Sequence, residues 1–154
     1  MRALGIDLGL RRVGLAISDA TGTLARPLET LRRETSDRDA LDRLQGVIDR
    51  LSAEPDGLAV VVVGLPTRLD GSPSDQTVHV RQMADALQSR IGVPVVLQDE
   101  RLSSHEAESR LALRERDWRK RKARLDAAAA AVILQDYLDT RASNRAVLPE
   151  EQES

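Results

Sequence analysis

The segment RALGIDLGLRRVGLAIS, residues 2–18, predicts the first two strands of a β-sheet. Residues 2–8 have the composition and alternation of a β-strand, residues 9–12 form a short connection, and residues 13–18 repeat the strand pattern. So short a connection predicts an antiparallel hairpin. A third strand is predicted at residues 23–30, after a glycine turn. The chain therefore begins with three antiparallel strands.

The elements that follow alternate between helix and strand. Apolar periodicity and turn residues predict helices at residues 36–51, 75–91, 103–113 and 125–139, and strands at residues 58–63 and 93–98. Strands joined through helices pair in parallel. We therefore expect an α/β fold: a mixed five-stranded sheet, antiparallel first and parallel later, flanked by helices.

Length and composition limit the class of protein. The 154 residues suffice for one domain, expected at residues 1–139, with residues 140–154 as a disordered tail. The absence of cysteine excludes disulfides and thiolate zinc sites, and it indicates a reducing, cytoplasmic location. No apolar run reaches membrane-spanning length, so we expect a soluble protein without a membrane partner.

Three acidic residues stand in apolar surroundings. Asp7 lies within LGIDLG, Glu100 ends VPVVLQDE, and Asp126 opens LDAAAAAVILQ. Burying a carboxylate is costly unless something offsets its lost hydration, so the three positions need a common explanation. Glu100 ends a strand, where open α/β sheets bind ligands, and a central first strand would bring Asp7 close to it. The alanines after Asp126 form a smooth helix that can approach the sheet.

A shared metal site is one such explanation. Two carboxylates about 4 Å apart repel by roughly 4 kcal/mol at an effective dielectric constant of about 20. A divalent cation removes this repulsion, and oxygen ligands suit Mg²⁺ or Mn²⁺ better than zinc. Two such ions would support phosphodiester hydrolysis. The alternative is that Asp7 caps a turn, Glu100 pairs with Arg101, and Asp126 is an ordinary helix-start acid.

Four motifs follow one another in the order of a known family. They are GIDLGLRRVGLAISD, VVVGLPTRLDG, DERLSS and LDAAAAAVILQDYLD, and together they span roughly residues 2–139. In this order they resemble the YqgF-type family, also called Holliday-junction resolvases or pre-16S ribosomal RNA nucleases. LSS stands where the family usually has LTT, a change that keeps the hydroxyl groups.

The resemblance implies an RNase H-like fold and a metal-dependent nuclease. Carried over residue by residue, it implies that Asp7, Glu100 and Asp126 are the catalytic metal ligands. Processing of the 5′ end of pre-16S ribosomal RNA is the function we expect from it. Cleavage of four-way DNA junctions is the alternative; paired cuts need a homodimer, whereas a monomer can process one RNA end. A binding module that keeps the fold without cleaving is an alternative of another class.

Basic residues crowd together just before Asp126. A phosphate backbone held by residues 114–124 would lie beside the proposed metal site. The alternative is a solvated charged loop. We expect contacts with nucleic acid, either a structured RNA precursor or branched DNA, from Arg11, Arg12, Arg101, Ser103, Arg116, Trp118, Arg119, Lys120, Arg121, Lys122 and Arg124.

Trp118 is the single tryptophan of a chain with almost no aromatic residues. We expect it to stack on a base or to wedge at a strand junction, with a cap over the core as the alternative. The two histidines, His79 and His105, are given no role.

Overall fold

The computed structural model describes the backbone of residues 1–9, 11–33, 36–68, 70–100 and 118–153, and the side chains of these residues except 118–125 and 144–153. The helix predicted at residues 103–113 lies outside this part of the chain. So do three of the residues predicted to bind nucleic acid, Arg101, Ser103 and Arg116.

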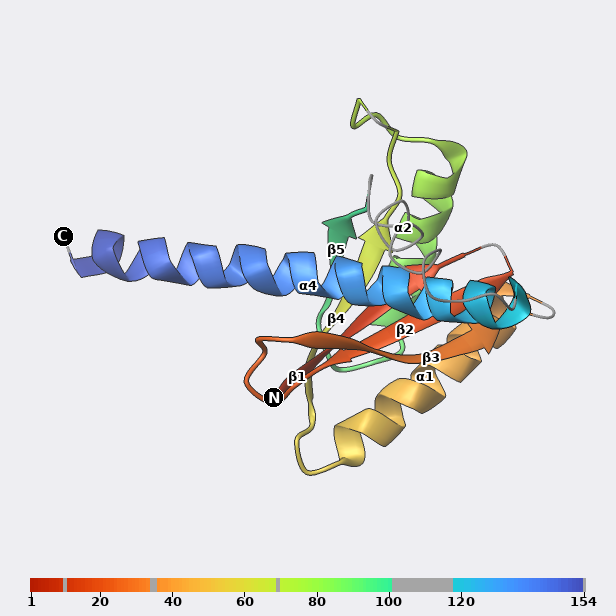
Figure 1. Ribbon diagram of the computed structural model, residues 1–154, viewed down its shortest axis with the longest axis horizontal. Coiled ribbons are helices and arrows are strands. Elements are labelled where there is room, and N and C mark those ends of the chain that lie inside the picture. Colours follow the sequence, from red (N-terminus) through yellow and green to blue (C-terminus); the bar gives the residue numbers. More distant parts are fainter. Residues whose placement is uncertain (10, 34–35, 69, 101–117, 154) are drawn as a thin grey trace.

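The described residues form a five-stranded sheet in the order β3-β2-β1-β4-β5 (Figure 1). The strands are β1 (Arg2–Leu8), β2 (Arg12–Ser18), β3 (Ala25–Arg32), β4 (Leu58–Leu65) and β5 (Val95–Asp99). β2 pairs antiparallel with both β1 and β3, whereas β4 pairs parallel with both β1 and β5. The predicted mixed sheet is confirmed, with β1 at its centre.

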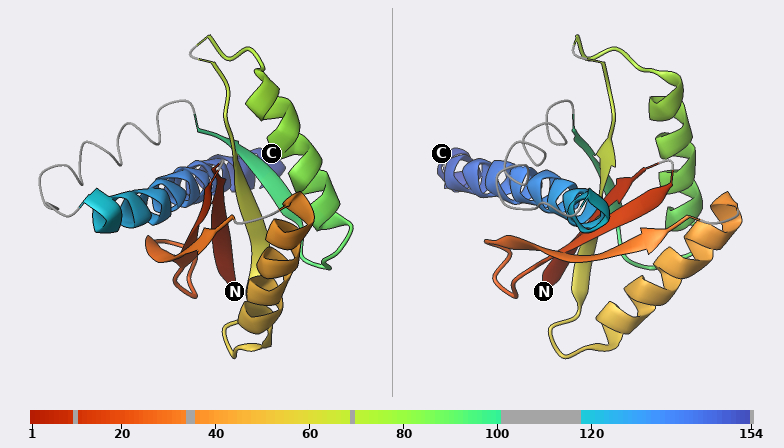
Figure 2. Two further views of the ribbon diagram at one scale, coloured as in Figure 1. Left: turned by 90° about the vertical axis from the view of Figure 1, so that its right-hand side faces the viewer. Right: turned by 45° about the vertical axis from the view of Figure 1, so that its right-hand side comes forward.

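The helices cover both faces of the sheet. Helices α1 (Asp37–Ala53) and α2 (Asp75–Gln88) lie on one face, and α4 (Trp118–Glu153) crosses the other (Figure 2). Ser36 accepts a hydrogen bond from the Asp39 amide and caps the start of α1. None of the described helices combines the length and apolarity needed to span a membrane.

Alternation along the strands divides the core between these two faces. Side chains such as Leu4, Ile6 and Leu15 pack toward α1 and α2, where large aliphatic residues fill the space. Small residues face α4 from the other side of the sheet, among them Ala3 and Ala16. The two faces therefore differ in thickness, because an alanine-rich interface lets a helix lie closer to the strands.

Glycines on the second face bring α4 against the bare backbone. A Cβ atom built at Gly14 would lie 2.0 Å from the Asp126 carbonyl oxygen, and one at Gly5 would lie 2.9 Å from the Ala130 carbonyl oxygen. Gln135 secures the same helix: its Oε1 accepts from the Ala25 amide at 2.9 Å, and its Nε2 donates to the Thr23 carbonyl at 2.9 Å. These contacts set where Asp126 lies along the sheet.

Helix α4 is longer than the sequence predicts. The expected helix spans residues 125–139 with a disordered tail at residues 140–154, but α4 runs from Trp118 to Glu153. No glycine or proline interrupts residues 118–148, so nothing in the backbone chemistry stops the helix at either predicted end. Its carboxyl-terminal part projects past the edge of the sheet (Figure 1).

The Gly14 contact predicts a strong effect of a single methyl group. Gly14→Ala should lower the free energy of unfolding by about 1 to 3 kcal/mol, because α4 must move away from β2. Gly46→Ala is the matched control, since a Cβ atom on this α1 residue meets open space. It should instead stabilise the protein by about 0.5 to 1 kcal/mol. Urea unfolding followed by circular dichroism measures both; equal values would contradict the close approach of α4.

Candidate functional site

The three acids predicted from the sequence converge at one edge of the sheet. Asp7 lies near the carboxyl end of β1, directly opposite Gly14 of β2. Glu100 follows β5, and its amide donates to the Leu65 carbonyl at 3.2 Å, so it stays in line with the ends of β4 and β5. Asp126 lies in α4 with its backbone against Gly14. Three distant segments of the chain thus meet at the face that α4 covers.

Two glycines make the room that these carboxyl groups occupy. A Cβ atom at Gly64 would lie 2.8 Å from Glu100 Oε2, and one at Gly14 would lie 2.0 Å from the Asp126 carbonyl oxygen. Any side chain at either position would therefore displace an acid. The bare patches of β2 and β4 flank Asp7 on the central strand, which explains how three carboxyl groups fit against an otherwise tightly packed sheet.

Burial and mutual charge raise the pKa of two of the acids. Burial, and then the charge of Asp126, raise the pKa of Asp7 to about 6, although a hydrogen bond with Glu100 lowers it. Burial raises the pKa of Glu100 to about 9, helped by the charge of Asp7, the hydrogen bond with Asp7 and the charge of Asp99. Because a hydrogen bond between two carboxyl groups requires a proton, the metal-free pair holds one proton between Asp7 and Glu100.

The donor chemistry of the site fits a hard divalent cation. All candidate ligands are carboxylate oxygens, and Glu100 Oε2 is buried with no hydrogen-bond partner among the described residues. Within the same described residues, no three acidic or histidine side chains are arranged so that they could hold an ion as they stand. Among the three acids, Asp7 and Glu100 are joined directly by a hydrogen bond, and Asp126 acts on Asp7 through its charge.

Arg12 lies on the same face as the acids. It begins β2 two residues before Gly14, so alternation points both toward α4. Its Nη1 atom is buried without a hydrogen-bond partner in the described part of the chain. A buried, unpaired guanidinium nitrogen is costly, and an anionic ligand would satisfy it. Arg11, the residue before it, is exposed in the turn.

The other predicted basic residues are placed only through their backbone. Trp118 begins α4, so residues 118–124 of the expected basic segment form the first turns of this helix. Its described members directly precede Asp126 along one continuous helix; they are Arg119, Lys120, Arg121, Lys122 and Arg124. The sequence did not predict that this segment and Asp126 share a helix.

Arg33 was missed by the sequence analysis. Its Nη1 donates to the Gly9 carbonyl at 3.1 Å, and its Nη2 binds the carboxylate of Asp37 at the start of α1. The same carboxylate contacts His79 Nε2 of α2 at 3.0 Å. Arg33 thereby ties the turn after Asp7 to two helices. Nothing in the local sequence pattern signals this role, since the partners are distant in the chain.

The loop after β4 also borders the site. Thr67 Oγ1 donates to Asp99 Oδ1 at 3.1 Å, next to Glu100. Pro66 accepts a hydrogen bond from Thr77 near the start of α2. These two contacts hold the beginning of the loop against β5 and α2, so it forms one wall beside the acids.

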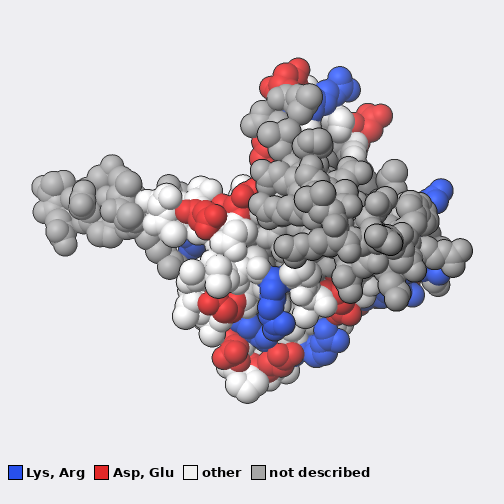
Figure 3. Space-filling view, viewed as in Figure 1, with Lys and Arg blue, Asp and Glu red and all other residues white. Residues whose placement is uncertain are grey.

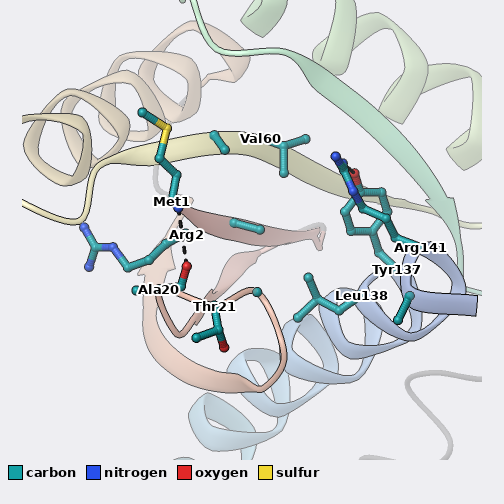
Figure 4. A pocket seen from close by; sticks show the side chains of 12 residues that line it. Met1, Arg2, Ala20, Thr21, Val60, Tyr137, Leu138 and Arg141 are labelled. Carbon is teal, nitrogen blue, oxygen red and sulfur yellow. Dashed lines mark hydrogen bonds between the residues drawn. The ribbon is translucent and has the colours of Figure 1, made fainter. Parts of the chain in front are cut away.

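A separate cavity of about 340 Å³ lies at the opposite end of the strands (Figure 4). It opens between the first residues of β1 and β4 and the part of α4 that carries Tyr137 and Arg141. Arg141 Nη1 donates to Tyr137 Oη at 2.8 Å along its edge. The described residues that line it include no carboxylate, so it is distinct from the acidic site.

The raised pKa values predict a pH dependence of stability. In the folded protein, Asp7 and Glu100 keep their protons to higher pH than they do in the unfolded chain. Without divalent metal, the free energy of unfolding should therefore fall as pH rises from the ordinary carboxyl range toward about 9. Glu100→Gln removes one charge and should stabilise the metal-free protein at the alkaline end by about 1 to 3 kcal/mol. Urea unfolding in EDTA across this pH range measures the effect.

Asp85→Asn, a change of an exposed acid on α2, is the control and should leave the pH slope as in the wild type. A Glu100→Gln protein with the wild-type slope would contradict the shared proton.

Comparison with other sequences identifies related proteins. The family model described as "RuvX: Holliday junction resolvase" matches residues 1–140. A protein named "Putative pre-16S rRNA nuclease" from Anaeromyxobacter sp. (strain Fw109-5) is 45% identical over 141 residues, covering 92% of this chain and 98% of its own length. A relative of the same name from Halothermothrix orenii is 40% identical over 139 residues, covering 90% and 95% respectively.

Solved structures share the fold. Thermus thermophilus RuvC superposes with a TM-score of 0.55 at 17% identity, covering 93% of this chain and 97% of that one. The yeast mitochondrial Holliday junction resolvase Ydc2 gives a TM-score of 0.54 at 12% identity, covering 94% and 80%. At such identities the likeness concerns the fold alone, and it confirms the predicted RNase H-like architecture.

Proposed function

The chain belongs to the RuvX family and is a nuclease that acts on phosphodiester bonds, and we propose that it processes the 5′ end of the precursor of 16S ribosomal RNA. The names of its relatives support this substrate. The observation that carries the reaction is the meeting of Asp7, Glu100 and Asp126 on a glycine-lined patch at the carboxyl edge of the sheet.

We propose these three acids as the catalytic residues and as ligands of Mg²⁺ or Mn²⁺, with two ions in the site. Nucleases and resolvases of this fold generally use divalent metals. When bound, such ions supply Lewis-acid stabilisation of the phosphate and a water of lowered pKa. The contribution of the chain is to hold three carboxylates together on rigid elements, at an electrostatic cost that a cation offsets.

Basic residues around the acids would hold the phosphate backbone. Arg12 supports this role through its unpaired Nη1 on the same face, and Arg11 stands exposed beside it. The remaining proposed contacts are Arg101, Ser103, Arg116, Trp118, Arg119, Lys120, Arg121, Lys122 and Arg124. We assign the nuclease to a domain of residues 1–139, with residues 140–154 outside it. A monomer suffices for one RNA end, and a cytoplasmic location follows from that substrate.

Cleavage of Holliday junctions is the second candidate. The family description and the RuvC-type fold favour it. A solved complex of T. thermophilus RuvC contains a Holliday junction substrate. This activity requires two sites related by a two-fold axis, and hence a dimer of this chain. A non-catalytic binding module, the remaining alternative, would bind nucleic acid without metal and cut nothing.

Isosteric changes of the acids test the proposed reaction. Asp7→Asn and Asp126→Asn should each lower cleavage of a precursor RNA by at least about 100-fold in Mg²⁺ or Mn²⁺, because each removes a charged ligand. The assay compares that RNA with a four-way DNA junction. Asp85→Asn serves as the matched surface control and should cleave like the wild type.

Three outcomes separate the candidates. Cleavage of the RNA alone supports the proposed substrate, and cleavage of the junction alone supports the resolvase. Undiminished cleavage by both acid variants would rule out the assignment of the site.

Fluorescence of Trp118 tests whether the start of α4 contacts the substrate. The chain has one tryptophan, so its emission reports on this position alone. Saturating precursor RNA should quench or shift the emission if a base stacks on the indole. The titration is performed in EDTA to prevent cleavage, and unchanged emission at saturation would count against contact.

A further inference from the structure

Pairing of β2 with β3 gathers arginines that are distant in the sequence. Arg12 of β2 lies directly opposite Arg32 of β3 in the antiparallel register. The Arg33 amide also donates to the Arg11 carbonyl at 2.8 Å, which continues the ladder into the turn. Two pairs of consecutive arginines therefore meet at the end of the hairpin that carries Asp7.

Three of these four arginines have no acidic partner among the described residues. Arg11, Arg12 and Arg32 form no ion pair with any carboxylate in the described part of the chain, whereas Arg33 binds Asp37 and Arg43 binds Asp39 at 3.3 Å. Arg43 also donates from Nη1 to the Arg32 carbonyl at 3.2 Å, but its charge is paired with Asp39. Like charges directly opposite each other destabilise a strand pair, so the arrangement has an energetic cost.

Arg12 and Arg32 share the face of the sheet on which the acids lie. Opposite residues of paired strands point the same way, and Arg12 faces α4 as Gly14 does. β3 is an edge strand, two strand spacings or about 10 Å from β1. On the described surface below α4, Lys and Arg side chains are interspersed with Asp and Glu side chains (Figure 3). Arg12 and Arg32 therefore lie side by side between the strand that carries Asp7 and the edge of the sheet.

We propose that Arg32, together with Arg12, forms a phosphate track along which the substrate strand leaves the acids across the ends of β2 and β3. The distance from β1 to β3 corresponds to about three nucleotides of a stacked strand. The ligand is the phosphodiester backbone, since guanidinium groups recognise phosphate irrespective of the base. This track rests on the proposed nuclease function, because it assumes a nucleic acid at Asp7, Glu100 and Asp126.

Arg33 has a different part in this arrangement. Its guanidinium is engaged by Gly9 and Asp37, so it is a positioning residue that holds the turn rather than a phosphate ligand. The exposed Arg32 has no such anchoring task for its side chain among the described residues. Substituting Arg32 therefore tests binding without removing a structural contact of the turn.

Binding of a fluorescein-labelled single-stranded RNA in EDTA tests the track by anisotropy. Arg32→Gln should weaken affinity about three- to tenfold at low salt and reduce the salt dependence of log Kd by about one charge. Arg32→Lys should restore most of the salt dependence, because it keeps the charge. Arg81→Gln, a change of an exposed arginine on α2 and hence on the other face, is the control and should bind like the wild type.

Unchanged affinity and salt slope for Arg32→Gln, or an equal loss for Arg81→Gln, would overturn the track. The test is independent of cleavage. If the wild type fails to process precursor RNA but Arg32→Gln still weakens RNA binding, the substrate assignment fails and the track stands. If the wild type processes precursor RNA and Arg32→Gln leaves RNA binding unchanged, the substrate assignment stands and the track fails.

Discussion

The contact between α4 and the bare backbone of β2 at Gly14 fixes the position of the last helix and, with it, of Asp126. The helix can lie there only because Gly14 has no side chain and because alanines fill the interface beyond Asp126. The hydrogen bonds of Gln135 to the β2–β3 connection secure the position of the helix along the strands. Once this contact is made, Asp126 lies beside Asp7, and the site is assembled from opposite ends of the chain.

The site is an electrostatic compromise. Three carboxyl groups on one patch repel, and without a cation the protein relieves part of this repulsion by keeping a proton between Asp7 and Glu100. The arginines at the end of β2 and β3 add a second accumulation of like charge within the same region. Opposite charges thus accumulate next to each other at the end of one hairpin, where metal ions and a phosphate backbone would satisfy both.

Most of the fold could be predicted from local patterns. The hairpin at residues 2–18, the parallel strands and the helices α1 and α2 appear within a few residues of their predicted ends, because alternation and turn residues act locally. The length of α4 could not be predicted from the same rules. Residues 118–148 contain no glycine or proline, but the dense charges at the start of this range resemble those of a solvated loop. Only the continuous helix shows that the basic segment and Asp126 form one element.

Local sequence patterns suffice to predict the mixed sheet and to single out three acids as candidates, since a carboxylate in an apolar segment is conspicuous wherever it occurs. The way these acids are held follows from contacts between distant segments. Several contacts join residues that are far apart in the chain. Gly14 and Gly64 leave room for the acids, and a hydrogen bond joins Asp7 to Glu100. Arg33 anchors the turn after Asp7, and strand pairing places Arg12 opposite Arg32. Such contacts depend on strand register and helix position, which no local pattern encodes.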